Sequence, residues 1–97
     1  MKIILSQQIT LGDFRKGLRN VTKTFESNVV PHKGDFISDS VWKDPYEYEV
    51  QEVNINYQQD ECYVQLPLIK LETNDKESLK GYIEMTRLHE WVCAVEV

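Results

Sequence analysis

The segment that most constrains the fold is an alternating stretch near the middle of the chain, residues 46–57. Its apolar residues occupy every second position, but their parity changes halfway: Tyr46, Tyr48 and Val50, then Val53, Ile55 and Tyr57. Such alternation is typical of a strand with one buried face. One extra residue near Gln51 and Glu52 would let both halves face the same core, which is the effect of a β-bulge. Because bulges bend strands, the segment predicts a bent sheet or a small barrel.

Other strand signals lie on both sides of this segment. Residues 2–9 alternate between apolar and polar, with Gln7 as the polar exception at an apolar position. Residues 62–66 would return beside the long strand after a polar hairpin tip. Pro67 has no N–H to donate, so it marks an edge or a bend. We therefore predict a mainly β chain with four to six strands and one or two short helices.

Residues 11–25 are ambiguous between helix and strand. Their apolar residues recur at helical spacing, and Thr10 with Asp13 resembles a helix N-terminal cap. Two glycines and a run of β-branched residues oppose a long helix. We expect a short helix over residues 11–18, followed by a strand from about residue 21 to residue 30.

The last third of the chain has weaker signals. Asn74 is a good N-cap residue, but Gly81 would weaken a following helix by about 1 kcal/mol relative to alanine. We expect a helical turn after Asn74, then extended chain, with residues 91–97 packed against the core. The alternative fold is an α+β two-layer sandwich with full helices over 11–25 and 75–89.

Size and composition indicate one globular domain, residues 1–97, since 41% of the residues are hydrophobic and 28% are charged. The two cysteines, Cys62 and Cys93, are fewer than a small secreted domain would carry. The first residues lack the features of a signal peptide. No apolar run approaches the ~18 residues needed to span a membrane. These features predict a cytoplasmic protein with reduced thiols and no membrane partner.

Charge is unevenly distributed along this acidic chain, whose net charge is −5. Residues 1–23 carry five lysines and arginines against one aspartate, whereas residues 44–77 carry nine acidic residues against two lysines. An acidic surface repels nucleic acid unless a local basic patch overrides the field, so nucleic acid is disfavoured as a partner. The acidic segment is typical of a solvated face, and it could also meet a basic partner.

No catalytic motif, metal-ligand spacing or cofactor loop occurs in the sequence, so no enzymatic activity, catalytic residue, metal ligand or cofactor is expected. His32 lies in a turn near Asp35, and His89 precedes a glutamate. A small enzyme or metal-binding protein that uses His32 or His89 with nearby carboxylates is an alternative. The two cysteines have no local base to activate them, which favours a role as small buried hydrophobic residues.

Two surfaces are candidate partner sites. The first is a basic loop, residues 15–19, with Arg15, Lys16 and Arg19 as possible anion contacts. The second contains Trp42 and an acidic stripe formed by Glu47 and Glu49 on the long strand, opposite its core face and beside the hairpin tip at Asp60 and Glu61. The stripe could dock a basic partner or the basic loop of a second copy.

The pattern Pro31-x-x-Gly34-Asp35-x-Ile37, followed by an aromatic residue and then Tyr48-x-Val50-x-x-Val53, resembles the opening of small SH3-like β-barrel domains. The resemblance covers residues 31–57, about a third of the chain, and many families share it. It implies a partly open barrel used for binding. The nucleic-acid-binding members tend to be basic around this turn, whereas the flanking segment here is acidic.

Together these features predict a non-enzymatic protein-interaction module, of the kind that serves as an accessory protein in microbes or mobile elements. Its partner would be another protein or a second copy of the chain. A weak nucleic-acid binder that acts through residues 15–19 is a further alternative.

Overall fold

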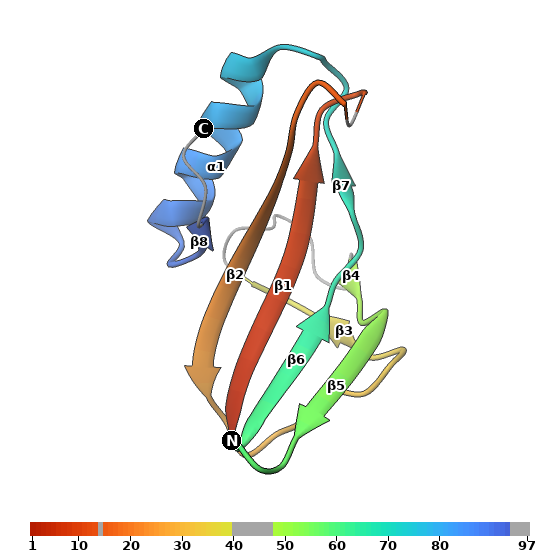
Figure 1. The fold of residues 1–97 in the computed structure, drawn as a ribbon, viewed down its shortest axis with the longest axis vertical. Helices are drawn as coiled ribbons and strands as arrows, with labels where there is room; N and C mark the ends of the chain where they lie inside the picture. The colour runs from red at the N-terminus through yellow and green to blue at the C-terminus, as the bar shows by residue number, and fades with distance from the viewer. Residues whose placement is uncertain (14, 40–47, 94–97) are drawn as a thin grey trace.

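The computed structural model describes residues 1–13, 15–39 and 48–93. As predicted, the fold is mainly β, and the described residues contain one helix (Figure 1). The main sheet consists, in spatial order, of β5 (Glu52–Asn56), β6 (Glu61–Gln65), β1 (Lys2–Thr10), β2 (Leu18–Glu26) and β8 (Val92–Cys93), with β7 (Ile69–Lys70) also paired to β1. Within the described residues, the edge strands β5 and β8 do not pair with each other. The sheet is therefore bent and open and is not a closed barrel.

The central strand β1 follows the alternation that predicted it. Its odd-numbered residues from Ile3 to Ile9 are buried, whereas the even-numbered ones from Lys2 to Gln8 are half-buried or exposed. β2 pairs with β1 antiparallel over its full length, and β6 runs parallel to β1 on the other side. In this register the odd-numbered residues of β2 lie on the same face of the sheet as those of β1, and Val21 among them is buried.

The short helix expected over residues 11–18 is wrong, because none of the described residues in that connection is helical. Thr10 lies opposite Leu18 in the ladder, so the chain must reverse between them. The Asp13 carboxylate accepts a hydrogen bond from the Arg15 N–H at 2.9 Å, which is turn chemistry. The strand expected from about residue 21 accordingly begins at Leu18 and ends at Glu26.

The edge of β1 that faces away from β2 is paired in two pieces. β6 covers its first half and β7 its last two residues, with Pro67 and Leu68 between them. The prediction that Pro67 marks a bend is confirmed. Gln7 is buried at this gap, and its Nε2 donates to the Pro67 carbonyl at 3.0 Å. The side-chain amide thus satisfies a carbonyl at the point where the ladder is interrupted.

The long strand predicted over residues 46–57 is divided between two sheets. Its first described part is β4 (Tyr48–Glu49), which pairs with β3 (Phe36–Ile37), and its second part is β5, which pairs with β6. The break falls at Val50 and Gln51, next to the position expected for a bulge. There the backbone changes partner between adjacent residues, because Val50 N–H donates to Asp35 and Gln51 N–H donates to Gln65.

Both halves of that divided strand nevertheless contact the same core, as their change of parity predicted. Val50 is buried, and Tyr48, Val53 and Ile55 pack against the core. The turn predicted before β3 is also present. Gly34 has a φ of +95°, a conformation that glycine adopts more readily than other residues.

Helix α1 (Lys76–Leu88) is longer than the single turn expected after Asn74. Its N-cap is Asp75, one residue later than predicted, and the Asp75 carboxylate accepts from the Glu77 N–H at 3.0 Å. The alternative fold predicted this helix nearly correctly over residues 75–89. Among the described residues, no helix is both long and apolar enough to cross a membrane.

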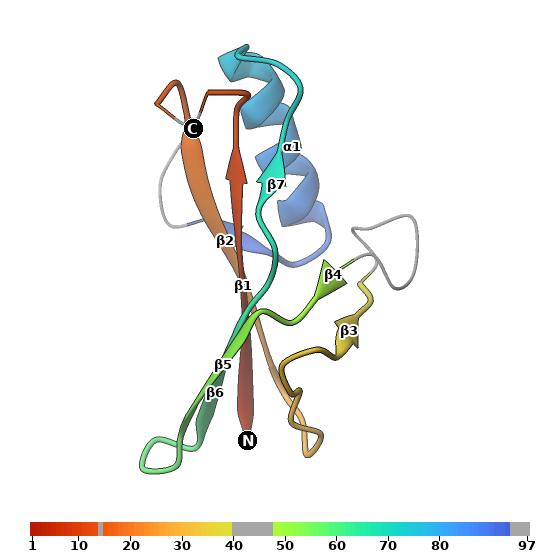
Figure 2. The same cartoon turned by 90° about the vertical axis from the view of Figure 1, so that its right-hand side faces the viewer.

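The elements form two layers (Figure 2). Helix α1 and the β3–β4 hairpin lie on the same side of the main sheet. The apolar face of α1, formed by Leu79, Ile83 and the methyl-bearing Thr86, is buried. Within the described residues no element covers the opposite face of the sheet. The core therefore lies between one face of the sheet and these two covering elements, while the other face is open to solvent.

Two glycine-to-alanine substitutions are expected to change stability in opposite directions. A Cβ at Gly17 would lie 2.9 Å from Leu79 Cδ2 and 3.0 Å from Leu11 Cδ1, and both leucines are buried. Gly17→Ala should therefore destabilise the fold by about 1–3 kcal/mol through overpacking. A Cβ at Gly81, on the exposed side of α1, meets no atom within 4 Å. Gly81→Ala should stabilise the fold by about 0.5–1 kcal/mol. Urea denaturation measures both, and the same sign for both substitutions would contradict the packing described here.

Candidate functional site

The β1–β2 turn is fixed against the segment that leads into α1. The N–H of Gly12 donates to the Thr73 carbonyl at 2.8 Å, and the N–H of Asp13 donates to Asn74 Oδ1 at 2.7 Å. Asn74, which the sequence suggested as a helix cap, thus holds the turn instead. These bonds bring the predicted basic loop next to the first turns of α1.

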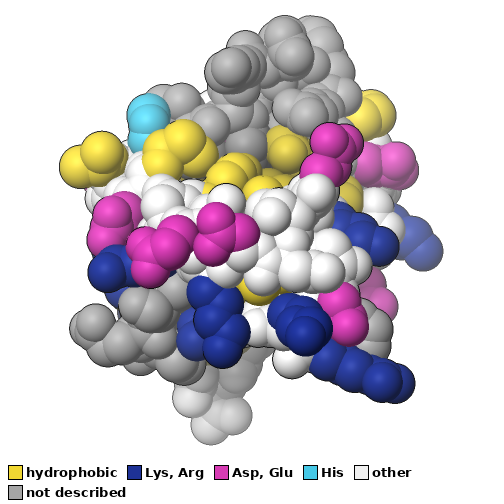
Figure 3. Space-filling model, turned by 90° about the horizontal axis from the view of Figure 1, so that it is seen from above, with side chains coloured by type: hydrophobic (Ala, Val, Ile, Leu, Met, Phe, Trp, Pro, Cys, Tyr) yellow, Lys and Arg dark blue, Asp and Glu magenta, His cyan; other side chains and the backbone are white. Residues whose placement is uncertain are grey.

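A basic hollow lies between this turn and α1. We define it by its lining residues, Lys16, Gly17, Arg19, Lys76, Glu77, Leu79 and Lys80, and its volume is about 320 Å³. Seen from this end of the molecule, Lys and Arg side chains lie mainly in the lower half of Figure 3. The hollow contains two of the three residues predicted in the basic loop. Arg15 is exposed in the same turn but does not line it.

Sequence reasoning missed Lys76 and Lys80. Their spacing of four residues places them on one face of α1, which the sequence alone could have indicated. Their position opposite Lys16 and Arg19 depends on the packing of the turn onto the helix. That packing is close, since Gly17 lies against Leu79.

The uncovered face of the sheet carries mainly uncharged polar side chains. The pairing register brings Ser6 of β1 next to Thr22 of β2 on one side and Gln65 of β6 on the other. Ser6 also donates to Asn20 Oδ1 at 3.1 Å. Tyr63 of β6, which pairs with Ile4, also lies on this face and is exposed.

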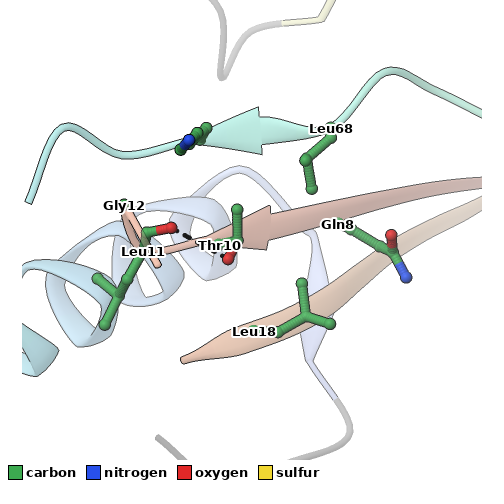
Figure 4. A pocket seen from close by; sticks show the side chains of 7 residues that line it. Gln8, Thr10, Leu11, Gly12, Leu18 and Leu68 are labelled. Carbon is green, nitrogen blue, oxygen red and sulfur yellow. Dashed lines mark hydrogen bonds between the residues drawn. The ribbon is translucent and has the colours of Figure 1, made fainter. Parts of the chain in front are cut away.

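An apolar hollow of about 250 Å³ opens on this uncovered face at the gap between β6 and β7 (Figure 4). Leu18 and Leu68 point toward each other across β1, with Thr10 between them. Leu18 is 40% exposed and Leu68 is 53% exposed, so two large apolar side chains on opposite sides of β1 are open to solvent. Lys70 and Gln8 also line the hollow and supply its polar groups.

Of the two glutamates of the predicted acidic stripe, only Glu49 lies among the described residues. Glu49 lies on β4, in the separate hairpin. Asp60 and Glu61 lie at the β5–β6 tip, where the amino terminus is 3.9 Å from Asp60 and Lys2 is 3.7 Å from Glu61. Trp42 and Glu47 lie outside the described residues.

The described residues contain no group of three or more His, Cys, Asp or Glu side chains that could hold a metal ion. His32 is exposed in its turn, with Nδ1 3.8 Å from Asp35 Oδ2. His89 is the C-cap of α1. Cys62 and Cys93 are buried free thiols, as expected for small hydrophobic residues, and burial raises the pKa of Cys62.

A partly buried polar cluster around Asp39 was not predicted. Asp39 accepts a hydrogen bond from Trp91 Nε1 at 3.0 Å and pairs with Lys23 Nζ at 2.6 Å. The three residues come from distant parts of the sequence, so no local pattern could have found them. The cluster joins the segment after β3 to β2 and to the chain between α1 and β8. Its role is therefore structural.

Comparison with known protein families, curated proteins and solved structures finds no match for this chain. Its function must therefore be argued from the surfaces described above.

Proposed function

We propose that this chain is a non-enzymatic protein-interaction module whose partner docks on the uncovered face of the sheet. The apolar hollow beside Leu18 and Leu68 is the observation that carries the proposal. Exposed apolar side chains that gather around a hollow are typical of docking sites. Partner side chains that fill such hollows contribute most of the binding energy in many protein interfaces.

The size of the hollow favours a partner side chain over a small-molecule substrate. Its volume of about 250 Å³ lies below the roughly 300–1,000 Å³ of typical small-molecule sites. The sheet also runs along the 40 Å axis of the molecule. That length is sufficient for the roughly 800 Å² per partner that a stable protein interface buries.

The chemistry of the rim indicates what the partner presents. Leu18, Leu68 and Leu11 supply apolar walls for one aliphatic or aromatic side chain. Lys70 on the rim would pair with an acidic residue beside it, and the hydroxyl and amide groups around Ser6 would hydrogen-bond to the polar rest of the interface. The proposed partner surface is therefore an apolar residue with an adjacent carboxylate.

Site-specific photo-crosslinking tests this proposal. A photoreactive phenylalanine analogue at position 68 should capture a discrete partner in cells, and Leu18→Asp in the same chain should abolish the capture. Position 88 is the matched control, because Leu88 is also an exposed leucine, at the end of α1 and away from the hollow. Thermal unfolding would establish that Leu18→Asp remains folded.

The mass of the captured species distinguishes the occupants. A product of twice the chain mass would identify a second copy, and a different mass would identify a separate protein. Absence of any product from position 68, or the same product from position 88, would overturn the proposal.

A further inference from the structure

The outer edge of β5 is a further surface, separate from both hollows. β5 is the last strand on one side of the main sheet (Figure 1), and no described residue pairs with its outer edge. Such an edge presents N–H and C=O groups to any extended chain that reaches it. We propose that β5 pairs antiparallel with β5 of a second copy of this chain, so that the two sheets join into one.

The direction of the backbone groups on β5 follows from the pairing of its neighbour β6. Leu66, directly after β6, donates its N–H to the carbonyl of Ser6 in β1 at 2.9 Å. Because backbone groups alternate in direction along a strand, the even-numbered residues of β6 are directed toward β1 and the odd-numbered ones toward β5. The odd-numbered residues of β6 pair with the even-numbered residues of β5. The N–H and C=O groups of Val53 and Ile55 are therefore directed away from the sheet.

The antiparallel register centred on Asn54 pairs all five residues of β5 with those of the second copy. It places Val53 opposite Ile55 of the second copy, and the two-fold axis repeats this pair. The backbone groups of both residues are directed outward, so each pair can exchange both of its main-chain hydrogen bonds. The register thus uses the backbone groups that the fold leaves at this edge.

Neighbouring registers that keep the same faces together are less favourable. A shift in one direction would require the outward groups of Gln51, but its N–H already donates to Gln65 at 2.9 Å. A shift in the other direction would require Tyr57, whose carbonyl accepts from the Asp60 N–H in the turn after β5 at 3.4 Å. The register centred on Asn54 needs neither residue.

The side chains are also complementary in this register. Val53 and Ile55 are half-buried and pack against the core, and pairing would cover more of their surface with the same residues of the second copy. Glu52 would lie opposite Asn56 of the second copy. The two copies of Glu52 would be ~14 Å apart, since a strand rises about 3.4 Å per residue. Pairing along β5 therefore places no two carboxylates directly opposite each other.

These features favour a second copy over a strand of another protein. The row of apolar residues on the core side of β5 continues to Tyr57, which is 81% exposed. Two-fold symmetry would bring this row against the same row of the second copy, so that apolar surface meets apolar surface. Because each chain would use its β5 edge once, the assembly closes at two copies.

The size and charge of the interface indicate its strength. A single strand of five residues is a small interface, so we expect a dissociation constant of about 10 μM to 1 mM. The net charge of −5 on each copy opposes association. Salt screens this repulsion, so the affinity should rise between low and physiological salt. A dimer formed by the basic loop of one copy on acidic residues of the other would weaken over the same range.

Sedimentation equilibrium at protein concentrations up to about 1 mM tests the pairing. The average mass of the wild type should rise toward twice the chain mass. Asn54→Lys should raise the dissociation constant about fivefold or more, because two lysines would then lie opposite each other at the two-fold axis. Thr24→Lys is the matched control. It adds the same charge at an exposed residue on the same face of the sheet, but on β2, and it should retain wild-type affinity.

A mixture of two variants tests the two-fold axis directly. Asn54→Asp alone should weaken the dimer as Asn54→Lys does. An equimolar mixture of the two variants should contain more dimer than either variant alone at the same total concentration, because a lysine then lies opposite an aspartate. Recovery in the mixture would show that the single variants remain folded and lose only the pairing.

Four results would each overturn the proposal. The first is a wild type that keeps the mass of one chain up to about 1 mM. The second is an affinity that falls as salt is added. The third is an affinity of Asn54→Lys equal to that of Thr24→Lys, and the fourth is a mixture with no more dimer than the separate variants.

Discussion

Replacing Trp91 by alanine is expected to lower the free energy of unfolding by about 3–5 kcal/mol. Trp91 is 2% exposed and is among the largest fully buried side chains. Its truncation leaves a cavity in the core and removes the indole N–H that donates to Asp39. Since a domain of this size has a total stability of only about 5–15 kcal/mol, part of the variant should be unfolded at room temperature.

Urea denaturation followed by circular dichroism measures this loss. Trp91→Phe retains most of the ring volume but not the N–H donor, so it should cost less than the alanine substitution. Val92→Ala is the neighbouring control, because Val92 is exposed. A loss for Trp91→Ala within about 0.5 kcal/mol of the Val92→Ala value would contradict the burial of Trp91, since surface substitutions have effects of that size.

Asp39→Ala is expected to cost about 2–3 kcal/mol, because it removes the shared acceptor of Lys23 and Trp91. The side chains of Asp39 and Lys23 are 10% and 17% exposed. Breaking a fully buried pair costs about 3–5 kcal/mol, and the smaller value here reflects the access of Lys23 to water. Asp39→Asn keeps an acceptor for the indole N–H but loses the charge, so its cost should be intermediate.

A double-mutant cycle with Lys23→Met separates the ion pair from the indole hydrogen bond. The loss from Asp39→Ala should be smaller in the Lys23→Met background, because no buried ammonium is then left without its partner. Asp35→Ala, at an exposed carboxylate in the turn before β3, is the control. Strict additivity of the Lys23 and Asp39 substitutions would show that the two side chains do not interact.

The strands that alternation predicted are those whose two faces differ. One face of β1 meets α1 and the β3–β4 hairpin, and the other meets water. Buried and more exposed residues therefore alternate along the strand. The change of parity of the apolar residues near Gln51 could likewise be read from the sequence. Its consequence differed from the expectation, since the backbone changes sheets there and no barrel closes.

The helix predictions differ from the structure where a residue or spacing that looks helical serves a tertiary contact instead. The spacing of apolar residues after Thr10 resembles a helix, but pairing of Thr10 with Leu18 requires a turn. Asn74 resembles a cap, but its side chain accepts from Asp13. The residue after the C-cap of α1 is Glu90, not the glycine that is common at this position. Glu90 has the left-handed conformation, with a φ of 71°.

Some residues of the candidate sites could be predicted from the sequence, and others depend on the tertiary structure. Arg15, Lys16 and Arg19 stood out as a basic run in the sequence, because neighbouring residues in a turn remain neighbours in the fold. Lys76 and Lys80 joined Lys16 and Arg19 only through the packing of Gly17 on Leu79. The apolar hollow had no sequence signal, because Leu18 and Leu68 belong to segments that become adjacent only across β1.

By itself the sequence determined the mainly β class, the positions of β1, β5 and β6, and the turn at Gly34, since periodicity and backbone preference act between near neighbours. Only the tertiary structure decided which strands pair, which face of the sheet stays uncovered and which charges meet. Those features depend on contacts between residues far apart in the chain. One example is the hydrogen bond from Gln7 to the Pro67 carbonyl, where the strand pairing along β1 is interrupted. Their free energy comes from burial and from hydrogen bonds that form only once the distant segments have come together.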